Sequence, residues 1–140
     1  MTLPQYMRII AYMKQKTPDF NGCLKAFKAL AEARRLRAAG LLAYAGRPLC
    51  VCEIVDALAE SQYNVSRALG ALCAAGIISK EKKGRWAMYA LADTRGHLAR
   101  HLLGLARPAP CCSPIARDIA RLEKRLARRE GGVCVIGCKC

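Results

Sequence analysis

The sequence predicts a mainly α-helical fold with one small β-hairpin, a winged helix-turn-helix that forms a homodimer. Three observations favour this class. Apolar residues recur at helical spacing over most of the chain, a capped helix with one polar face follows a short apolar helix, and two β-compatible runs then flank a glycine. A length of 140 residues, 54% of them apolar, suits one domain with terminal arms.

The N-terminal elements are read from this periodicity. Residues 1–21 are expected to form a helical arm, because residues 17–22 break its pattern. The winged domain is expected over residues 22–130. Its first part, from Leu24 to Ala45, keeps a helical period, and a bend near Glu32 is expected to divide it into two helices.

A third core helix and a recognition helix are predicted next. Val51, Ile54, Val55 and Leu58 mark the third helix, after a break at residues 46–48. Ser61 is a suitable N-cap for the recognition helix, and Gly76 closes it. The buried face of that helix is expected to hold Val65, Leu69 and Leu72.

The hairpin and the C-terminal helices complete the prediction. Residues 77–81 and 86–91 are expected to pair, with Gly84 supplying the positive φ of the turn. A short helix is expected near residues 98–105. A second helix starts at Ser113 with a narrow apolar stripe, which suits packing on a partner helix, so residues 106–130 are assigned to dimerisation. Residues 131–140 form a Cys-rich tail.

The charge of the chain indicates a polyanionic partner. Lys and Arg total 24 against 10 Asp and Glu, a formal net charge of +14. A generally basic surface or a membrane-facing patch is the alternative. No run approaches the roughly 18 apolar residues that span a bilayer, and the N-terminus lacks a signal-peptide pattern. We therefore expect a cytoplasmic protein without membrane contact, in which the nine cysteines are reduced.

The polar face of the recognition helix is a candidate for reading double-stranded DNA. Gln62 can pair with adenine through two hydrogen bonds, and Arg67 with guanine or phosphate. An ordinary solvated face is the alternative for the helix alone, but the basic hairpin and the net charge favour DNA. The predicted DNA contacts are Gln62, Tyr63, Asn64, Ser66, Arg67, Lys82, Lys83 and Arg85.

Two thiols one residue apart, Cys50 and Cys52, stand at the head of the third core helix. Thiolates select soft ions. Because residues at i and i+2 do not share a helical face, one ion reaches both sulfurs only if the first turn distorts. The alternative is a pair of small buried hydrophobes, and packing is the expectation for Cys73.

The two-thiol motif, the recognition helix and the hairpin together resemble the ArsR family (ArsR/SmtB type), in its arsenite-responsive branch. The resemblance spans Leu24 to Leu91 and rests on the motif of residues 49–54, on residues 61–69 and on residues 75–78 and 84–89. The family usually has His where Ala68 stands, and an acidic-Pro-Thr-Arg turn at residues 32–35. The resemblance implies a non-enzymatic, homodimeric repressor that trivalent arsenic, or antimony, releases from operator DNA.

The resemblance leaves the third ligand open. The family's arsenite motif has a third cysteine where this chain has Val55. Cys111 and Cys112 resemble the C-terminal thiol pair of other arsenic sensors in the family, and we expect the third thiolate there. The other candidates are Cys23 across a dimer, and Cys138 and Cys140 in the tail, where Cys134 also lies.

Two further readings remain. Asp93, His97 and His101 resemble part of the zinc site found in other branches of the family, which would make zinc the regulator. A thiol-based metal-buffering or redox protein is the other reading. Against redox enzymes stands the lack of a C-x-x-C motif and of a nucleotide-binding glycine loop.

Overall fold

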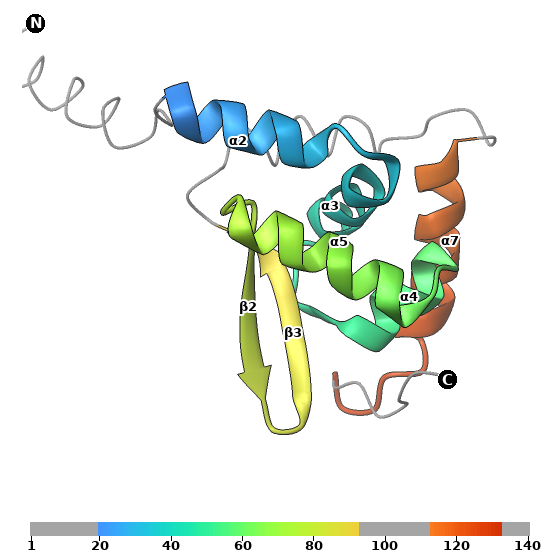
Figure 1. The fold of residues 1–140 in the computed structure, drawn as a ribbon. Coiled ribbons are helices and arrows are strands. Elements are labelled where there is room, and N and C mark those ends of the chain that lie inside the picture. Colours follow the sequence, from blue (N-terminus) through green and yellow to red (C-terminus); the bar gives the residue numbers. More distant parts are fainter. Residues whose placement is uncertain (1–19, 93–112, 133–140) are drawn as a thin grey trace, which may run out of the picture.

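A computed structural model of the chain describes residues 20–92 and 113–132 (Figure 1). The predicted arm before Phe20, the short helix near residues 98–105 and the tail after Gly132 lie outside these ranges. The described elements are α2 Phe20–Leu30, α3 Ala33–Ala45, β1 Leu49–Cys50, α4 Val51–Leu58, α5 Gln62–Ala74, β2 Ile78–Lys83, β3 Trp86–Leu91 and α7 Pro114–Leu126.

The helices of the core follow the prediction, and their boundaries have local causes. The Glu32 carboxylate caps α3 by accepting hydrogen bonds from the amides of Arg34 (3.2 Å) and Arg35 (3.0 Å), which explains the bend before that helix. Gly46 ends α3 in the left-handed conformation, at φ 61°. The expected boundary between residues 21 and 22 falls inside α2, because Gly22 lies in the first turn, where the break in apolar periodicity does not stop a helix.

The predicted hairpin is present and continues into a third strand. β2 runs on through Lys83, which pairs with Trp86 across a turn that contains Gly84 at φ 59°. β1 was not predicted. It pairs antiparallel with β3, Leu49 opposite Tyr89 and Cys50 opposite Met88, so that the strand order is β1-β3-β2. A two-residue strand is too short to show an alternating pattern.

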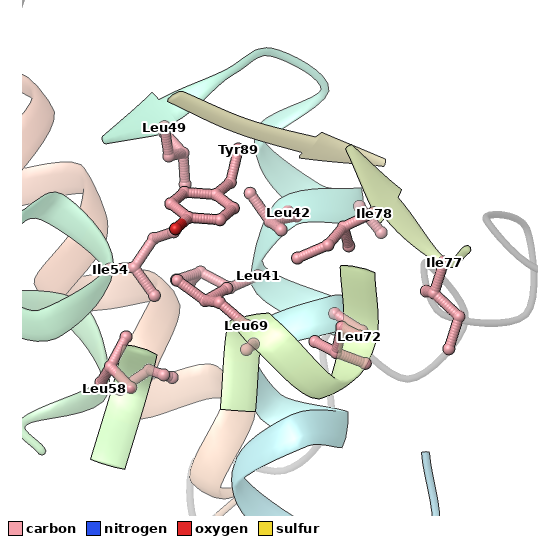
Figure 2. Close-up of a cluster of buried hydrophobic side chains, with 14 of the residues drawn as sticks. Leu41, Leu42, Leu49, Ile54, Leu58, Leu69, Leu72, Ile77, Ile78 and Tyr89 are labelled. Atoms are coloured by element: carbon pink, nitrogen blue, oxygen red, sulfur yellow. The ribbon is translucent and has the colours of Figure 1, made fainter. Parts of the chain in front are cut away.

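The core lies between α3, α4, α5 and the sheet (Figure 2). Leu41 of α3, Ile54 of α4 and Leu69 of α5 are fully buried and meet there. Tyr89 of β3 joins them from the sheet. Because protein interiors are close-packed, a displacement of α4 is transmitted to α5 and to β3 through this cluster.

The apolar stripe of α7 is used inside the chain. Ile115 and Leu122 are buried, and Ile119 and Leu126 pack against the same core. The helix lies beside α3 and α4 (Figure 1). The stripe was the reason for placing α7 at a dimer interface, and that reason is wrong because the chain itself covers the stripe. The wider assignment of residues 106–130 to dimerisation stays a prediction.

Among the described helices, none has the length and apolar character that crossing a membrane requires.

Candidate nucleic-acid interface and thiol site

The exposed face of α5 carries the side chains predicted to read DNA. Ser61 caps the helix, its hydroxyl accepting a hydrogen bond from the Asn64 amide at 3.2 Å. Val65, Leu69 and Leu72 are buried as predicted. Gln62, Tyr63, Ser66 and Arg67 are exposed, and Asn64 is half-buried. The helix thus presents a polar face whose position the core fixes.

Arg67 is held along this face by its neighbour one turn earlier. Its guanidinium donates a hydrogen bond to the Tyr63 hydroxyl at 3.3 Å and lies 5.6 Å from the centre of the Tyr63 ring. Both side chains are exposed. The contact orders the long Arg67 side chain on the exposed surface of α5, where a guanidinium can meet a base edge or a phosphate.

The hairpin adds a basic strip next to α5. Lys82, Lys83 and Arg85 are all exposed at its tip. The guanidinium carbon of Arg85 lies 5.0 Å from the centre of the Trp86 ring. The hairpin projects beyond the helices (Figure 1). Such a projection suits contact with phosphates that flank a groove.

A cleft of about 330 Å³ lies between the start of α3 and the polar face of α5. Arg34 and Arg35 line one side, and Asn64 and Arg67 line the other. The sequence analysis did not predict Arg34 and Arg35 as part of this surface. Their clustering within two positions was the available signal. They extend the basic surface from the recognition helix to α3.

The thiols of Cys50 and Cys52 are buried together at the junction of β1 and α4. Cys50 is fully buried and Cys52 is 4% exposed, and neither forms a disulfide with another described cysteine. Val51, Trp86 and Met88 pack against the pair. Cys50 ends β1 and is the N-cap of α4, while Cys52 lies in its first turn. The pair therefore contacts α4 and the wing strand β3 at once.

A buried ion pair supports this junction. The Glu53 carboxylate is fully buried and accepts a hydrogen bond from the Cys50 amide at 3.0 Å. It also accepts two from Arg129, at 2.6 and 2.7 Å. Burial by itself would raise the Glu53 pKa, but the hydrogen bonds from Arg129 and Cys50 outweigh it and hold that pKa below its ordinary value of 4.5. The sequence analysis missed both residues, although glutamate three positions after a helix cap is a recognised signal.

Arg129 contacts two further groups. It donates to the Pro48 carbonyl at 3.1 Å and to the Gly132 carbonyl at 3.3 Å. The chain just after α7 is thereby tied to the loop that leads into Cys50.

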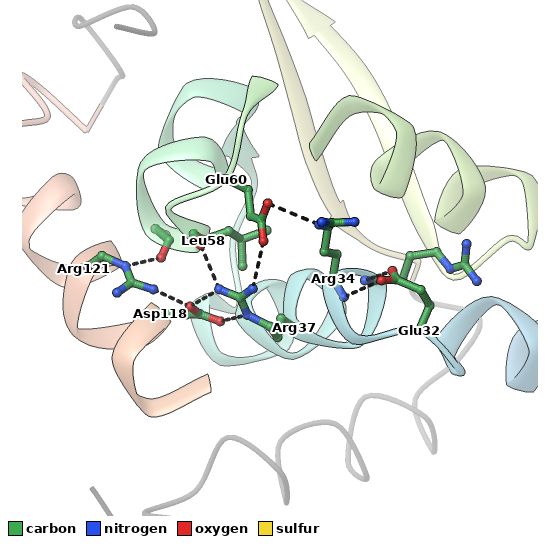
Figure 3. A network of polar contacts seen from close by, with 9 residues as sticks. Glu32, Arg34, Arg37, Leu58, Glu60, Asp118 and Arg121 are labelled. Atoms are coloured by element: carbon green, nitrogen blue, oxygen red, sulfur yellow. Dashed lines mark hydrogen bonds and ion pairs between the residues drawn. The ribbon is translucent and has the colours of Figure 1, made fainter. Parts of the chain in front are cut away.

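A polar network joins α7 to α3 and α4 at the other end (Figure 3). The buried Asp118 carboxylate accepts hydrogen bonds from Arg37 at 2.8 Å and from Arg121 at 2.7 Å. Arg37 also donates to the carbonyl of Leu58, the last residue of α4, at 2.8 Å. Its pKa is raised chiefly by the hydrogen bond to Asp118.

The described residues hold two thiols of the expected site and no third ligand. Within residues 20–92 and 113–132, no three His, Cys, Asp or Glu side chains gather in a way that could hold a metal ion. Cys23 and Cys73 lie outside the cluster that Cys50 and Cys52 form. Cys73 packs against the core as expected, and burial raises its pKa although Lys80 opposes this. The remaining predicted ligands lie outside the described residues: Asp93, His97, His101, Cys111, Cys112, Cys134, Cys138 and Cys140.

Comparison with known sequences identifies similar regulators. Residues 34–80 match the family model "Bacterial regulatory protein, arsR family". The chain is 46% identical over 65 residues to the arsenic resistance transcriptional regulator ArsR1 of Pseudomonas putida, a match that covers 46% of this chain and half of that protein. It is 35% identical to the arsenical resistance operon repressor of Bacillus subtilis, covering 61% of this chain and 75% of the relative.

Solved structures support the same fold. HlyU from Vibrio cholerae matches with a TM-score of 0.56 and 25% identity, covering 64% of this chain and 96% of that chain. The homodimeric winged helix-turn-helix DNA-binding domain of a possible ArsR-family regulator from Mycobacterium bovis matches with a TM-score of 0.52 and 26% identity, covering 61% and 81%. The arrangement of α3, α4, α5 and the hairpin is thus that of a winged helix-turn-helix.

Proposed function

The chain belongs to the arsR family of bacterial regulatory proteins, and from this premise we propose that it is a repressor which trivalent arsenic releases from its operator. Cys50 and Cys52 supply two of the thiolates that bind the inducer. One observation carries the proposal: the two buried cysteines at the head of α4, the helix that leads into α5, pack against the wing strand β3.

The DNA-bound form in this proposal is a homodimer. The two α5 helices occupy successive major grooves, about 34 Å apart, on an operator with two-fold symmetry. Gln62 and Arg67 read base edges, while Lys82, Lys83 and Arg85 contact phosphates. Support for the dimer comes from α2, where Phe20, Leu24 and Phe27 share one helical face and are 82%, 43% and 68% exposed.

The chemistry of the pair suits a thiophilic trivalent element. Soft thiolates select arsenic(III), and antimony(III) has the same preference. The pair is buried in apolar surroundings, because Trp86 and Met88 pack against it. Zinc prefers four ligands, which Cys50 and Cys52 alone do not provide.

Arsenic binding is coupled to DNA release by two routes, one through α4 to α5 and one through β1 to the wing. Because the thiols stand at i and i+2 at the head of α4, closing them on one atom distorts the first turn. The distortion pulls on α5 through the shared core, and on the wing through the pairing of Cys50 with Met88. A coupling of about 1–3 kcal/mol, or roughly 5- to 150-fold in affinity, is typical and sufficient.

The test is fluorescence anisotropy of a labelled promoter fragment with the reduced protein at fixed salt. We expect arsenite to release the wild type and to leave the Cys50→Ser and Cys52→Ser variants bound. Cys73→Ser is the matched control and should respond as the wild type does. Release by zinc, with indifference to arsenite, would overturn the proposal and move regulation to Asp93, His97 and His101.

A further inference from the structure

We propose that the cleft between the start of α3 and the polar face of α5 holds a phosphate of the DNA backbone, and that Arg34 is its main ligand. The inference rests on the DNA-binding part of the proposed function and is independent of arsenic. It adds a third element, α3, to a DNA surface made of α5 and the hairpin. The ArsR family usually has threonine where this chain has Arg34, so the contact is a property of this chain.

The lining of the cleft is strongly cationic. It contains three arginines, Arg34, Arg35 and Arg67, and one carboxylate, that of Glu32. The Glu32 carboxylate accepts hydrogen bonds from the backbone amides of Arg34 and Arg35, at 3.2 and 3.0 Å, as the cap of α3. The amides at the helix start are thus occupied, and the arginine side chains are the groups that attract an anion.

Arg34 is held in place by the turn between α4 and α5. Its Nε lies 3.2 Å from a carboxylate oxygen of Glu60 (Figure 3). Arg37 contacts the other oxygen of Glu60 at 3.4 Å and also pairs with the buried Asp118. The Arg34 side chain is 45% exposed, and no acceptor among the described residues contacts its two terminal amino groups. Arg34 is therefore ordered, and it keeps the paired donors that suit a phosphate.

The opposite wall of the cleft supplies a neutral donor and the space for a ligand. Asn64 lines this wall from the first turn of α5, and Ala68 and Ala71 continue it. The side-chain amide of Asn64 can donate to an oxygen of a phosphate that Arg34 binds from the other wall. The volume of about 330 Å³ accommodates a phosphate group with several waters, since one water takes about 30 Å³ in the liquid.

The cleft and the hairpin lie on different sides of the recognition helix. The start of α3 packs on one side of α5, and the hairpin adjoins the other (Figure 1). A major groove is about 12 Å wide and takes one helix, so the phosphates of both strands flank α5 when it enters the groove. The hairpin then contacts one strand and Arg34 the other. Contacts on both edges fix the orientation of α5 in the groove.

The test compares Arg34→Gln with Arg128→Gln, which removes the same charge from an exposed position after α7. Affinity for the labelled promoter fragment is measured by anisotropy at several salt concentrations, without arsenite. We expect Arg34→Gln to bind about tenfold more weakly and to lower the salt dependence of binding by about one ion per subunit. Arg128→Gln should bind as the wild type does, and circular dichroism should show that both variants are folded.

A scan of the DNA backbone locates the phosphate. Each phosphate of the fragment is replaced in turn by a neutral methylphosphonate. The wild type and Lys83→Ala should lose about tenfold in affinity at one phosphate in each half-site, and Arg34→Gln should lose nothing at that phosphate. Wild-type affinity of Arg34→Gln, or an equal loss in all three proteins at every phosphate, would overturn the inference.

Inorganic phosphate offers the same chemistry as the DNA backbone and is tested separately. Calorimetric titration of the protein with inorganic phosphate, without DNA, should show no saturable binding. Saturable binding that Arg34→Gln abolishes would assign the cleft to a free anion and overturn the inference.

Failure of the proposed function is distinguishable, because a phosphate contact does not depend on DNA sequence. A wild type that has no operator preference, or that arsenite does not release, would contradict the proposed function. Arg34→Gln would still lower the salt dependence of binding to any duplex DNA, whereas an unchanged salt dependence would contradict the phosphate contact alone.

Discussion

Cys50 combines two structural roles with its proposed chemistry. It pairs with Met88 in the sheet and caps α4. Serine is among the best helix caps, so Cys50→Ser should keep the fold while removing the soft ligand. We expect its free energy of unfolding in urea to lie within about 1 kcal/mol of the wild type, and its operator affinity to be unchanged. A variant that unfolds or loses DNA binding would show that Cys50 is structural.

Exposed residues on α5 and on the wing should contribute differently to DNA binding. Gln62→Ala would remove the proposed base contact and should cost about 1–3 kcal/mol of operator binding free energy, with relaxed specificity at one position. Lys83→Ala would remove the proposed phosphate contact. It should weaken binding to all DNA sequences equally and lower the salt dependence of binding by about one ion. Anisotropy titrations at several salt concentrations measure both quantities. If both variants changed the dependence of affinity on DNA sequence to the same extent, the assignment of Gln62 to a base and Lys83 to a phosphate would be contradicted.

At the scale of elements, long periodic segments were predictable and short or tertiary features were not. The recognition helix and the hairpin were predicted because Ser61, Val65 and Gly84 give local signals. β1 was missed, since two residues carry no periodicity. The stripe of α7 was placed at a dimer interface because the sequence does not show that α3 and α4 lie over it.

Only those features of the candidate site that lie close together in the sequence could be predicted. Cys50 and Cys52 are adjacent in the sequence, and the exposed residues of α5 follow from its period. The pair Glu53–Arg129 joins residues 76 positions apart. A contact of that separation exists only once α7 has docked on α4, so no local pattern indicates it.

The docking of α7 through this pair has a pH signature. The Glu53 pKa is lowered in the folded state, so the pair contributes stability above about pH 4.5 that is lost as pH falls through the folded pKa. Arg129→Met should cost about 3–5 kcal/mol at pH 7, because it leaves a buried carboxylate without its charged partner. Urea unfolding at pH 7 and pH 4 should show this deficit shrinking in acid. A pH-independent deficit would exclude the ion pair as its cause.

At the scale of the whole molecule, the proposed function requires a dimer that spaces two α5 helices. Phe27 is 68% exposed on the apolar face of α2, which the proposal assigns to the dimer interface. Phe27→Glu should yield monomers in sedimentation and a large loss of operator affinity, with the α-helical signal retained. Lys28→Glu, on an exposed neighbouring residue, controls for the added charge. A dimeric Phe27→Glu variant would move the interface elsewhere.

The central claim is that inducer binding at the thiol pair and release of DNA are one event. The most direct measurement is a single arsenite titration of the reduced protein on labelled operator, with sulfur–arsenic absorbance and anisotropy recorded together. We predict that the two signals change in parallel and are complete at one arsenic per subunit. Saturation of the absorbance while the protein stays on its operator, or release without any absorbance change, would contradict the account.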